Sequence, residues 1–213
     1  MDIKKLLPAA GVIGGSAALQ KGSETIADKI KGISSDRRKK ILKKLHDMGY
    51  QKQDVGLTGD MAGIDPAKKI FDYGSEASDA SLAHELGHAR SSIPQALVEG
   101  SRTLTKGSPY LAGAGVAAHA LTDDKAKKDR IRKATLGGTA LAGLPYAAGE
   151  LGASINAIKE LDLQKGDLSN LAANTGTSLA RALGPTALAG GYFLHDHLKE
   201  RRKDNAEEFN DRR

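Results

Sequence analysis

The chain has no cysteine and no tryptophan, and aromatic residues make up only 4% of its 213 residues. Without cysteine there can be no disulfide bond, no thiolate metal ligand and no cysteine nucleophile. The scarcity of aromatic side chains argues against binding of nucleic acid by base stacking, so we expect no specific nucleic-acid partner. Any metal ion must therefore be held by histidine, aspartate or glutamate.

Long hydrophobic runs free of charge are also missing, although the composition is strongly segregated along the chain. Charged stretches alternate with four stretches rich in Ala, Gly and Leu, at residues 6–19, 110–121, 134–158 and 171–194. The first resembles a signal-peptide core or a short membrane anchor, and a buried N-terminal helix fits it equally well. The second is too short to cross a bilayer as a straight helix, which needs about 20 residues. The other two contain Glu150 and Arg181, and a central Arg costs ~2.5–3.5 kcal/mol on insertion scales. A helical hairpin dipped into a membrane and a soluble bundle both fit this pattern.

The formal net charge is +6, and a dense basic run lies at residues 37–44. Such a run most often forms a solvated helix face. Beside apolar segments it also suits an anionic membrane surface. We therefore expect association with a membrane on its cytoplasmic side, where anionic lipids concentrate.

Residues 84–88 read His-Glu-Leu-Gly-His and form an H-E-x-x-H motif. On a helix, positions i and i+4 share one face, so His84 and His88 can reach one metal ion. Glu85 projects beside them and can accept a proton from a metal-bound water. Zn2+ suits two imidazoles, a third protein ligand and an open position. We predict that residues 75–92 contain the helix that carries this site, and that it ends before Pro94.

Glu150 is the candidate for the third ligand, because it is an acid inside an apolar helical stretch. An ionised carboxylate in such a position is costly unless it is paired or bound to a metal. The alternative is an ion pair with Arg181 in the neighbouring apolar stretch. Tyr146 and Tyr192 are the candidates for stabilising a tetrahedral oxyanion.

Three short motifs give the chain a resemblance to a known family. Asp-Pro at 65–66, Leu-Ala-His-Glu-Leu-Gly-His-Ala at 82–89 and Glu-Leu-Gly-Ala-Ser at 150–154 occur in this order. Over roughly residues 55–190 the chain resembles the bacterial neutral zinc membrane metallopeptidases. This resemblance implies His84, His88 and Glu150 as zinc ligands and Glu85 as the general base. It also implies a hydrophobic hairpin between the two ligand-bearing helices.

The predicted fold class is mainly α. We expect a helical bundle with the H-E-x-x-H helix, apolar helices rich in small residues, and at most a short β-hairpin. The hairpin strands are expected at 55–57 and 69–71, around a turn at 63–66. The expected divisions are an apolar N-terminal segment (1–20), a basic helical region (21–50), a zincin-like domain (51–194) and a charged C-terminal tail (195–213).

The sequence favours a zinc peptidase that acts on a peptide or protein substrate. A second reading is a structural or membrane-penetrating protein, for example an internal component of a phage virion, with a vestigial or structural metal site. Its support is the set of helices rich in small residues together with the basic surface. Glu85 separates the two readings, since hydrolysis needs this base and a structural metal site does not.

Overall fold

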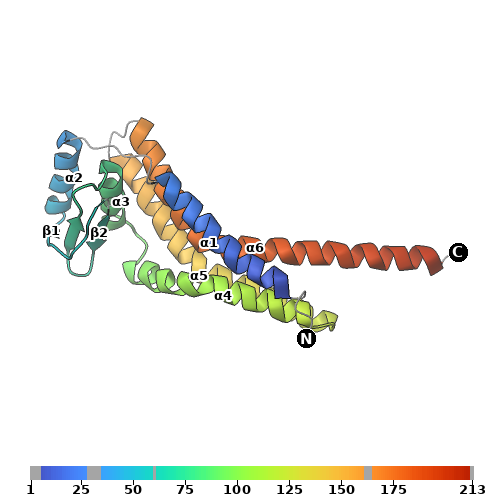
Figure 1. Cartoon of the computed structure of the whole chain (residues 1–213). Coiled ribbons are helices and arrows are strands. Elements are labelled where there is room, and N and C mark those ends of the chain that lie inside the picture. Colours follow the sequence, from blue (N-terminus) through green and yellow to red (C-terminus); the bar gives the residue numbers. More distant parts are fainter. Residues whose placement is uncertain (1–5, 28–34, 60, 161–164, 212–213) are drawn as a thin grey trace.

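The computed structural model describes residues 6–27, 35–59, 61–160 and 165–211. Over these residues the chain forms a mainly α fold with a small sheet, as predicted (Figure 1). The helices are α1 (Leu7–Ala27), α2 (Ser35–Asp47), α3 (Asp79–Ala89), α4 (Gln95–Leu121), α5 (Lys125–Glu160) and α6 (Lys165–Asp211). The strands are β1 (Gln51–Lys52), β2 (Ala62–Asp65) and β3 (Ile70–Tyr73).

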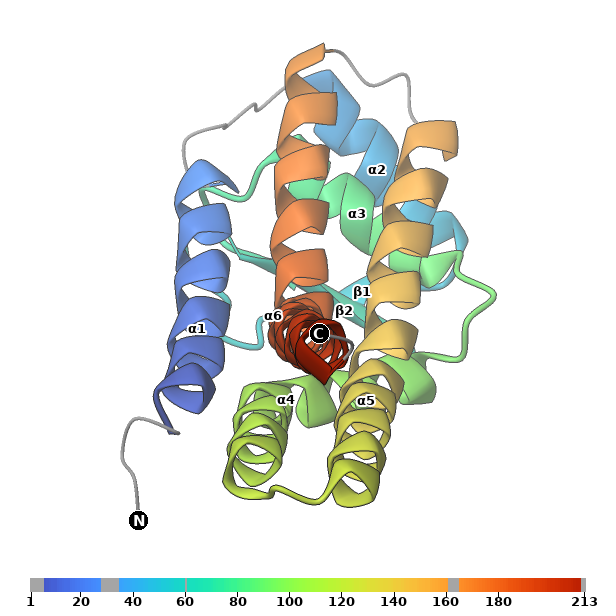
Figure 2. The same ribbon diagram turned by 90° about the vertical axis from the view of Figure 1, so that its right-hand side faces the viewer.

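The four long helices pack into a bundle, and α2, α3 and the sheet lie at one end of it (Figures 1 and 2). Each long helix contains one of the four apolar stretches. Small residues let these helices approach closely. At Gly143 of α5, an added Cβ would lie 2.1 Å from the carbonyl oxygen of Ala182 in α6. Among the described residues, no helix is both long enough and apolar enough to cross a membrane.

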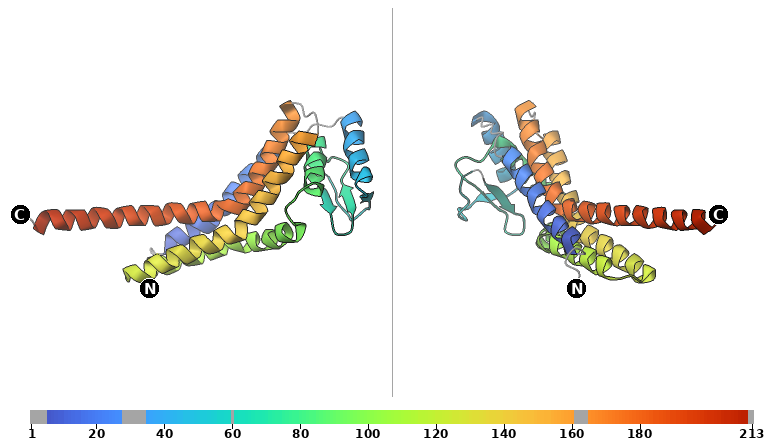
Figure 3. Two further views of the ribbon diagram at one scale, coloured as in Figure 1. Left: turned by 180° about the vertical axis from the view of Figure 1, so that it is seen from behind. Right: turned by 45° about the vertical axis from the view of Figure 1, so that its right-hand side comes forward.

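Two of the long helices extend well beyond their apolar stretches. The helix α5 begins at Lys125, inside the charged stretch before residue 134, because the Asp124 carboxylate accepts the backbone amides of Ala126 and Lys127 in the first turn. At the other end, α6 continues past His195 to Asp211 and projects alone from the bundle (Figure 3). Residues 196–207 are mostly good helix formers. Lys128 of α5 also holds this part through Glu200, at 2.6 Å.

The sheet has three strands in the order β1-β3-β2, with β2 antiparallel and β1 parallel to β3. The prediction of a strand at residues 55–57 is wrong. Val55 and Leu57 lie in a loop, because their backbone amides donate to the Asp72 carboxylate at 2.9 and 3.3 Å instead of to a neighbouring strand. The expected turn is also displaced, since residues 62–65 form β2 and the turn follows Asp65.

The motif helix α3 is held at its first turn by its own N-cap and by contacts from α2. The Ser78 side chain caps the helix by accepting the amide of Ser81 at 3.0 Å. Arg38 of α2 donates to the carbonyl of Ala77 and pairs with the buried Asp79 carboxylate at 3.4 Å. Part of the basic run therefore positions the motif helix and does not only face solvent.

The close contact of α5 with α6 gives a matched pair of alanine substitutions. Gly143→Ala should lower the free energy of unfolding by about 1–3 kcal/mol, because the new methyl group meets backbone that cannot move alone. Gly137→Ala in the same helix meets no atom within 4 Å. It should raise the free energy of unfolding by up to about 1 kcal/mol through helix propensity. Urea unfolding followed by circular dichroism measures both, and equal effects would contradict the packing described here.

Candidate metal centre

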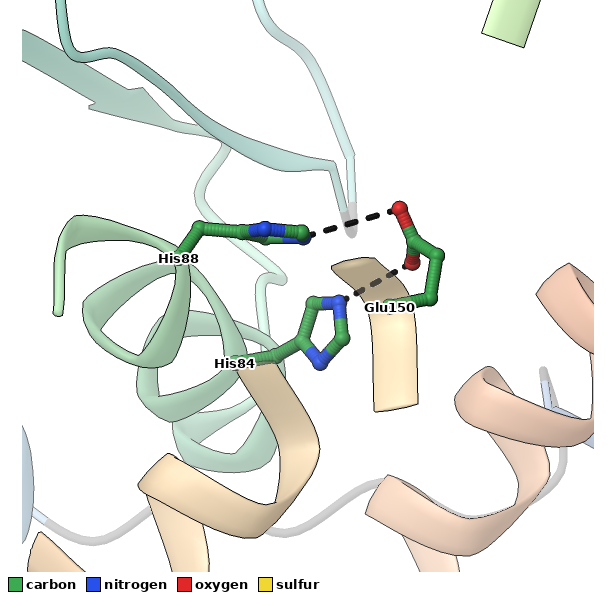
Figure 4. Close-up of side chains that lie close together, drawn as sticks. All are labelled: His84, His88 and Glu150. Carbon is green, nitrogen blue, oxygen red and sulfur yellow. Dashed lines mark hydrogen bonds and ion pairs between the residues drawn. The ribbon is translucent and has the colours of Figure 1, made fainter. Parts of the chain in front are cut away.

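A close contact between α3 and α5 positions the candidate metal ligands. Gly87, in the middle of the motif, lies against α5 so closely that a Cβ there would be 1.9 Å from the Ala153 carbonyl oxygen. Asn156 of α5 also donates its side-chain amide to the Gly87 carbonyl at 3.3 Å. This contact brings the face of α3 with His84 and His88 opposite Glu150, one turn away along α5 (Figure 4).

His84, His88 and Glu150 form a group that could hold a metal ion. The Nε2 atom of His84 lies 3.1 Å from one Glu150 oxygen, and the Nε2 atom of His88 lies 3.5 Å from the other. The three ligand atoms all lie within 4.8 Å of one another. Tetrahedral ligands bonded at about 2.0–2.2 Å to zinc are separated from each other by roughly 3.3–3.5 Å. The side chains therefore already stand near the spacing that one metal ion requires.

A chain of hydrogen bonds fixes the orientation of the His84 ring. The Thr175 hydroxyl donates to the Leu171 carbonyl at 2.7 Å, so its oxygen accepts from Ser154. Ser154 in turn accepts from Nδ1 of His84 at 3.0 Å. With its proton on Nδ1, the ring turns Nε2 toward Glu150. A ligand histidine is commonly oriented by a hydrogen bond of this kind.

The centre is mostly buried, and its charges are strongly coupled. Burial alone would raise the pKa of Glu150, but hydrogen bonds from His84 and His88 outweigh burial and hold that pKa far below its usual range. Burial opposes protonation of His88, yet Glu150 and Glu85 together raise the pKa of that ring. The metal-free centre thus favours an ionised carboxylate facing protonated imidazole, and a divalent cation can replace the protons.

Glu85 lies in the wall of a cavity of about 360 Å³ that also contains the three ligands. The edge strand β2 lines the same cavity through residues 62–64, and the backbone amide of Ile64 donates to Glu85. Burial raises the pKa of Glu85, and the nearby His88 and His84 oppose that rise. Glu85 is therefore a partly buried carboxylate beside the candidate ligands, and its affinity for a proton is increased.

The structure separates the two tyrosines considered from the sequence. Tyr146 lines the cavity, and its hydroxyl lies 3.5 Å from the Ser178 hydroxyl, which donates to Glu150 at 2.9 Å. Tyr192 packs against His119 in a different apolar cluster and does not line this cavity, so it is excluded as an oxyanion donor. Arg181, the alternative partner of Glu150, lines the same cavity as the centre.

Thr175 and Ser178, both on α6, were not identified from the sequence. The only signal for them is the recurrence of small polar residues at helical spacing, at 170, 174, 175 and 178 in an otherwise apolar stretch. That signal is weak, since hydroxyl side chains in helices often bond only to their own backbone.

Comparison with protein-family models, with curated proteins and with solved structures finds no match for this chain. The metallopeptidase resemblance therefore depends on the short motifs and on the geometry of the residues within them.

The pKa of Glu150 predicts how the stability of the metal-free protein changes with pH. Because folding lowers this pKa, the ionised carboxylate stabilises the fold above the unfolded pKa of about 4.3, and the contribution is lost as the pH falls. After treatment with a chelator, the melting temperature should fall progressively as the pH drops below about 5, and the fall should continue below pH 3 because the folded pKa lies far below its usual range. Glu150→Gln should flatten that drop, whereas Glu207→Gln, an exposed site on α6, should not. Equal profiles for both variants would contradict the coupling.

Proposed function

We propose that this protein is a zinc-dependent peptidase in which His84, His88 and Glu150 bind the metal and Glu85 is the general base. The observation that carries the proposal is the meeting of the H-E-x-x-H helix with a buried carboxylate from a second helix, at 3.1 and 3.5 Å. Two imidazoles and one carboxylate are a donor set that catalytic zinc sites use, and the absence of cysteine is compatible with it.

Each part of the cavity has a role in this proposal. Bound zinc supplies a Lewis acid that polarises the scissile carbonyl and activates water near neutral pH. Glu85 accepts the proton of the attacking water and passes it to the leaving amine. Tyr146 lines the cavity and is the candidate donor to the developing oxyanion.

The edge strand β2 supports a peptide as the substrate. In the sheet order β1-β3-β2, the strand β2 lies at an edge, and within the described residues it pairs on one side with β3. Its other side faces the cavity, so an extended peptide can add to the sheet through main-chain hydrogen bonds. Binding in this way places the peptide between β2 and α3, with one of its carbonyl groups beside the histidines.

The first test is the metal content. Protein purified without chelator should contain close to one zinc per chain, with ligand distances of about 2.0–2.2 Å by X-ray absorption. His84→Ala and Glu150→Ala should lose the metal, and His195→Ala, an exposed histidine on α6, should keep it. Ser154→Ala should weaken zinc affinity by roughly 10–100-fold, because His84 loses the acceptor that orients its ring. Full metal content in Glu150→Ala would exclude Glu150 as a ligand.

The second test separates a peptidase from a structural metal site. Glu85→Gln should reduce hydrolysis of a peptide library by roughly 10²–10⁴-fold while zinc content stays unchanged, because the amide cannot accept the proton of water. Undiminished cleavage by this variant would falsify the role of Glu85. If the wild-type protein holds zinc and cleaves no peptide in the library, the site is structural and the second reading of the sequence is favoured.

A further inference from the structure

One side of α4 is an exposed apolar stripe that runs almost the whole length of the helix. The stripe recurs at alternating spacings of three and four residues, which is the heptad pattern of helices that pack on other helices. Every member is uncharged and exposed to solvent. The members are Leu97, Gly100, Leu104, Gly107, Leu111, Ala114, Ala118 and Leu121.

A second stripe with the same spacing runs along α5. All of its members are also uncharged and exposed, and Leu141 is 76% exposed. Arg130 and Lys159 flank it at the two ends. The members are Ala134, Gly137, Leu141, Leu144, Ala148, Leu151, Ile155 and Ile158.

The two stripes lie side by side on one face of the α4–α5 hairpin, here called the hairpin face, and the α5 stripe continues past the first residue of α4 to Ile158. The Leu111 side chain reaches the α5 backbone at Gly138, where an added Cβ would lie 3.1 Å from it, and Gly138 adjoins the α5 stripe. Near the other end, Val98 adjoins Leu97 and contacts Gly149 of α5. Arg102 lines the metal-site cavity and lies on the other side of α4 from Leu104, so the hairpin face does not include the cavity.

The size of the hairpin face matches what a stable protein interface requires. It includes nine leucine and isoleucine side chains, all of them exposed. Their combined exposed area is on the order of 900 Å², above the roughly 300–600 Å² of the largest patch on a typical monomer. A standard interface buries about 800 Å² on each partner.

The pattern of the face favours a protein helix over lipid as its partner. On α4, leucines at every seventh position alternate with Gly100, Gly107 and Ala114. Large side chains next to small ones form the knobs and holes of helix packing, which lipid tails do not require. The stripes contain both the large and the small side chains of such a fit and no charged residue, and the exposed charges nearest the α5 stripe, Arg130, Lys133 and Lys159, lie toward its two ends.

We propose that the hairpin face is the interface of a homodimer, in which the α4–α5 hairpins of two copies pack as a four-helix bundle about a two-fold axis. The metal-site cavity stays open in this dimer, because it lies on the other side of α4. The inference does not depend on the proposed peptidase function.

Sedimentation equilibrium of the full chain tests the dimer. The wild type should be dimeric at micromolar concentration, and the double variant Leu104→Lys, Leu141→Lys should weaken dimerisation by at least ~10²-fold, because two charges enter an apolar interface. Leu194→Lys is the control, since Leu194 and Leu104 are both 60% exposed but Leu194 lies on α6. This control should remain dimeric, and all variants should keep wild-type helicity and zinc content.

Three outcomes would overturn the dimer: a monomeric wild type at about 100 μM, a double variant that stays dimeric, or a monomer that binds phosphatidylcholine vesicles through this face. The last outcome would assign the face to lipid. If the double variant misfolds, the absence of natural cysteine allows a second measurement. A short bifunctional maleimide should join two copies of Ala148→Cys and should not join two copies of Ala206→Cys, which lies far along α6.

Discussion

The structure depends on the contact between the backbones of α3 and α5 at Gly87 and Ala153. No side chain separates the helices there, and none fits, since a Cβ on Gly87 would overlap the Ala153 carbonyl. The distance from either histidine to Glu150 follows from this one approach. The glycine of the motif is therefore a requirement of packing, independent of any chemistry at the site.

A buried carboxylate in an apolar bundle is costly, and the surrounding helices supply what offsets the cost. Two imidazoles and the Ser178 hydroxyl satisfy the oxygens of Glu150. Behind them, Ser154 and Thr175 carry the hydrogen bonds of His84 to the backbone of α6. The helices α3, α5 and α6 thus share one chain of hydrogen-bonded side chains through an otherwise apolar interior. This chain is continuous only when the three helices are correctly positioned along one another.

Much of the fold and the core of the site could be predicted from the sequence. The i, i+4 spacing of His84 and His88 predicted a helix with both rings on one face. Glu150 was predicted as their partner because it is the acid within its apolar stretch. The helical class followed from the segregation of small apolar residues.

Other features lay beyond the sequence because they depend on tertiary contacts. Serine and threonine on α6 have no pattern that distinguishes support of a metal centre from bonding to their own helix. Which tyrosine faces the cavity depends on the rotation of each helix in the bundle, so the sequence could not choose between Tyr146 and Tyr192. The start of α5 depends on a cap at Asp124. The continuation of α6 past His195 depends on the ion pair of Lys128 with Glu200. The strand expected at 55–57 failed because Asp72 takes up the amides of that segment.

The candidate ligands lie far apart along the chain, since Glu150 follows His84 by 66 positions. Closing a loop of that length costs conformational entropy before any contact forms. During synthesis the histidines emerge well before the carboxylate, and the orienting hydroxyl of Thr175 emerges later still. The group of three side chains that could hold a metal ion is complete only when α3 and α5 are packed together, so an ion bound by all three would be captured after that contact forms. A cation that binds only this assembled state would hold the ends of that loop together, much as a covalent cross-link does.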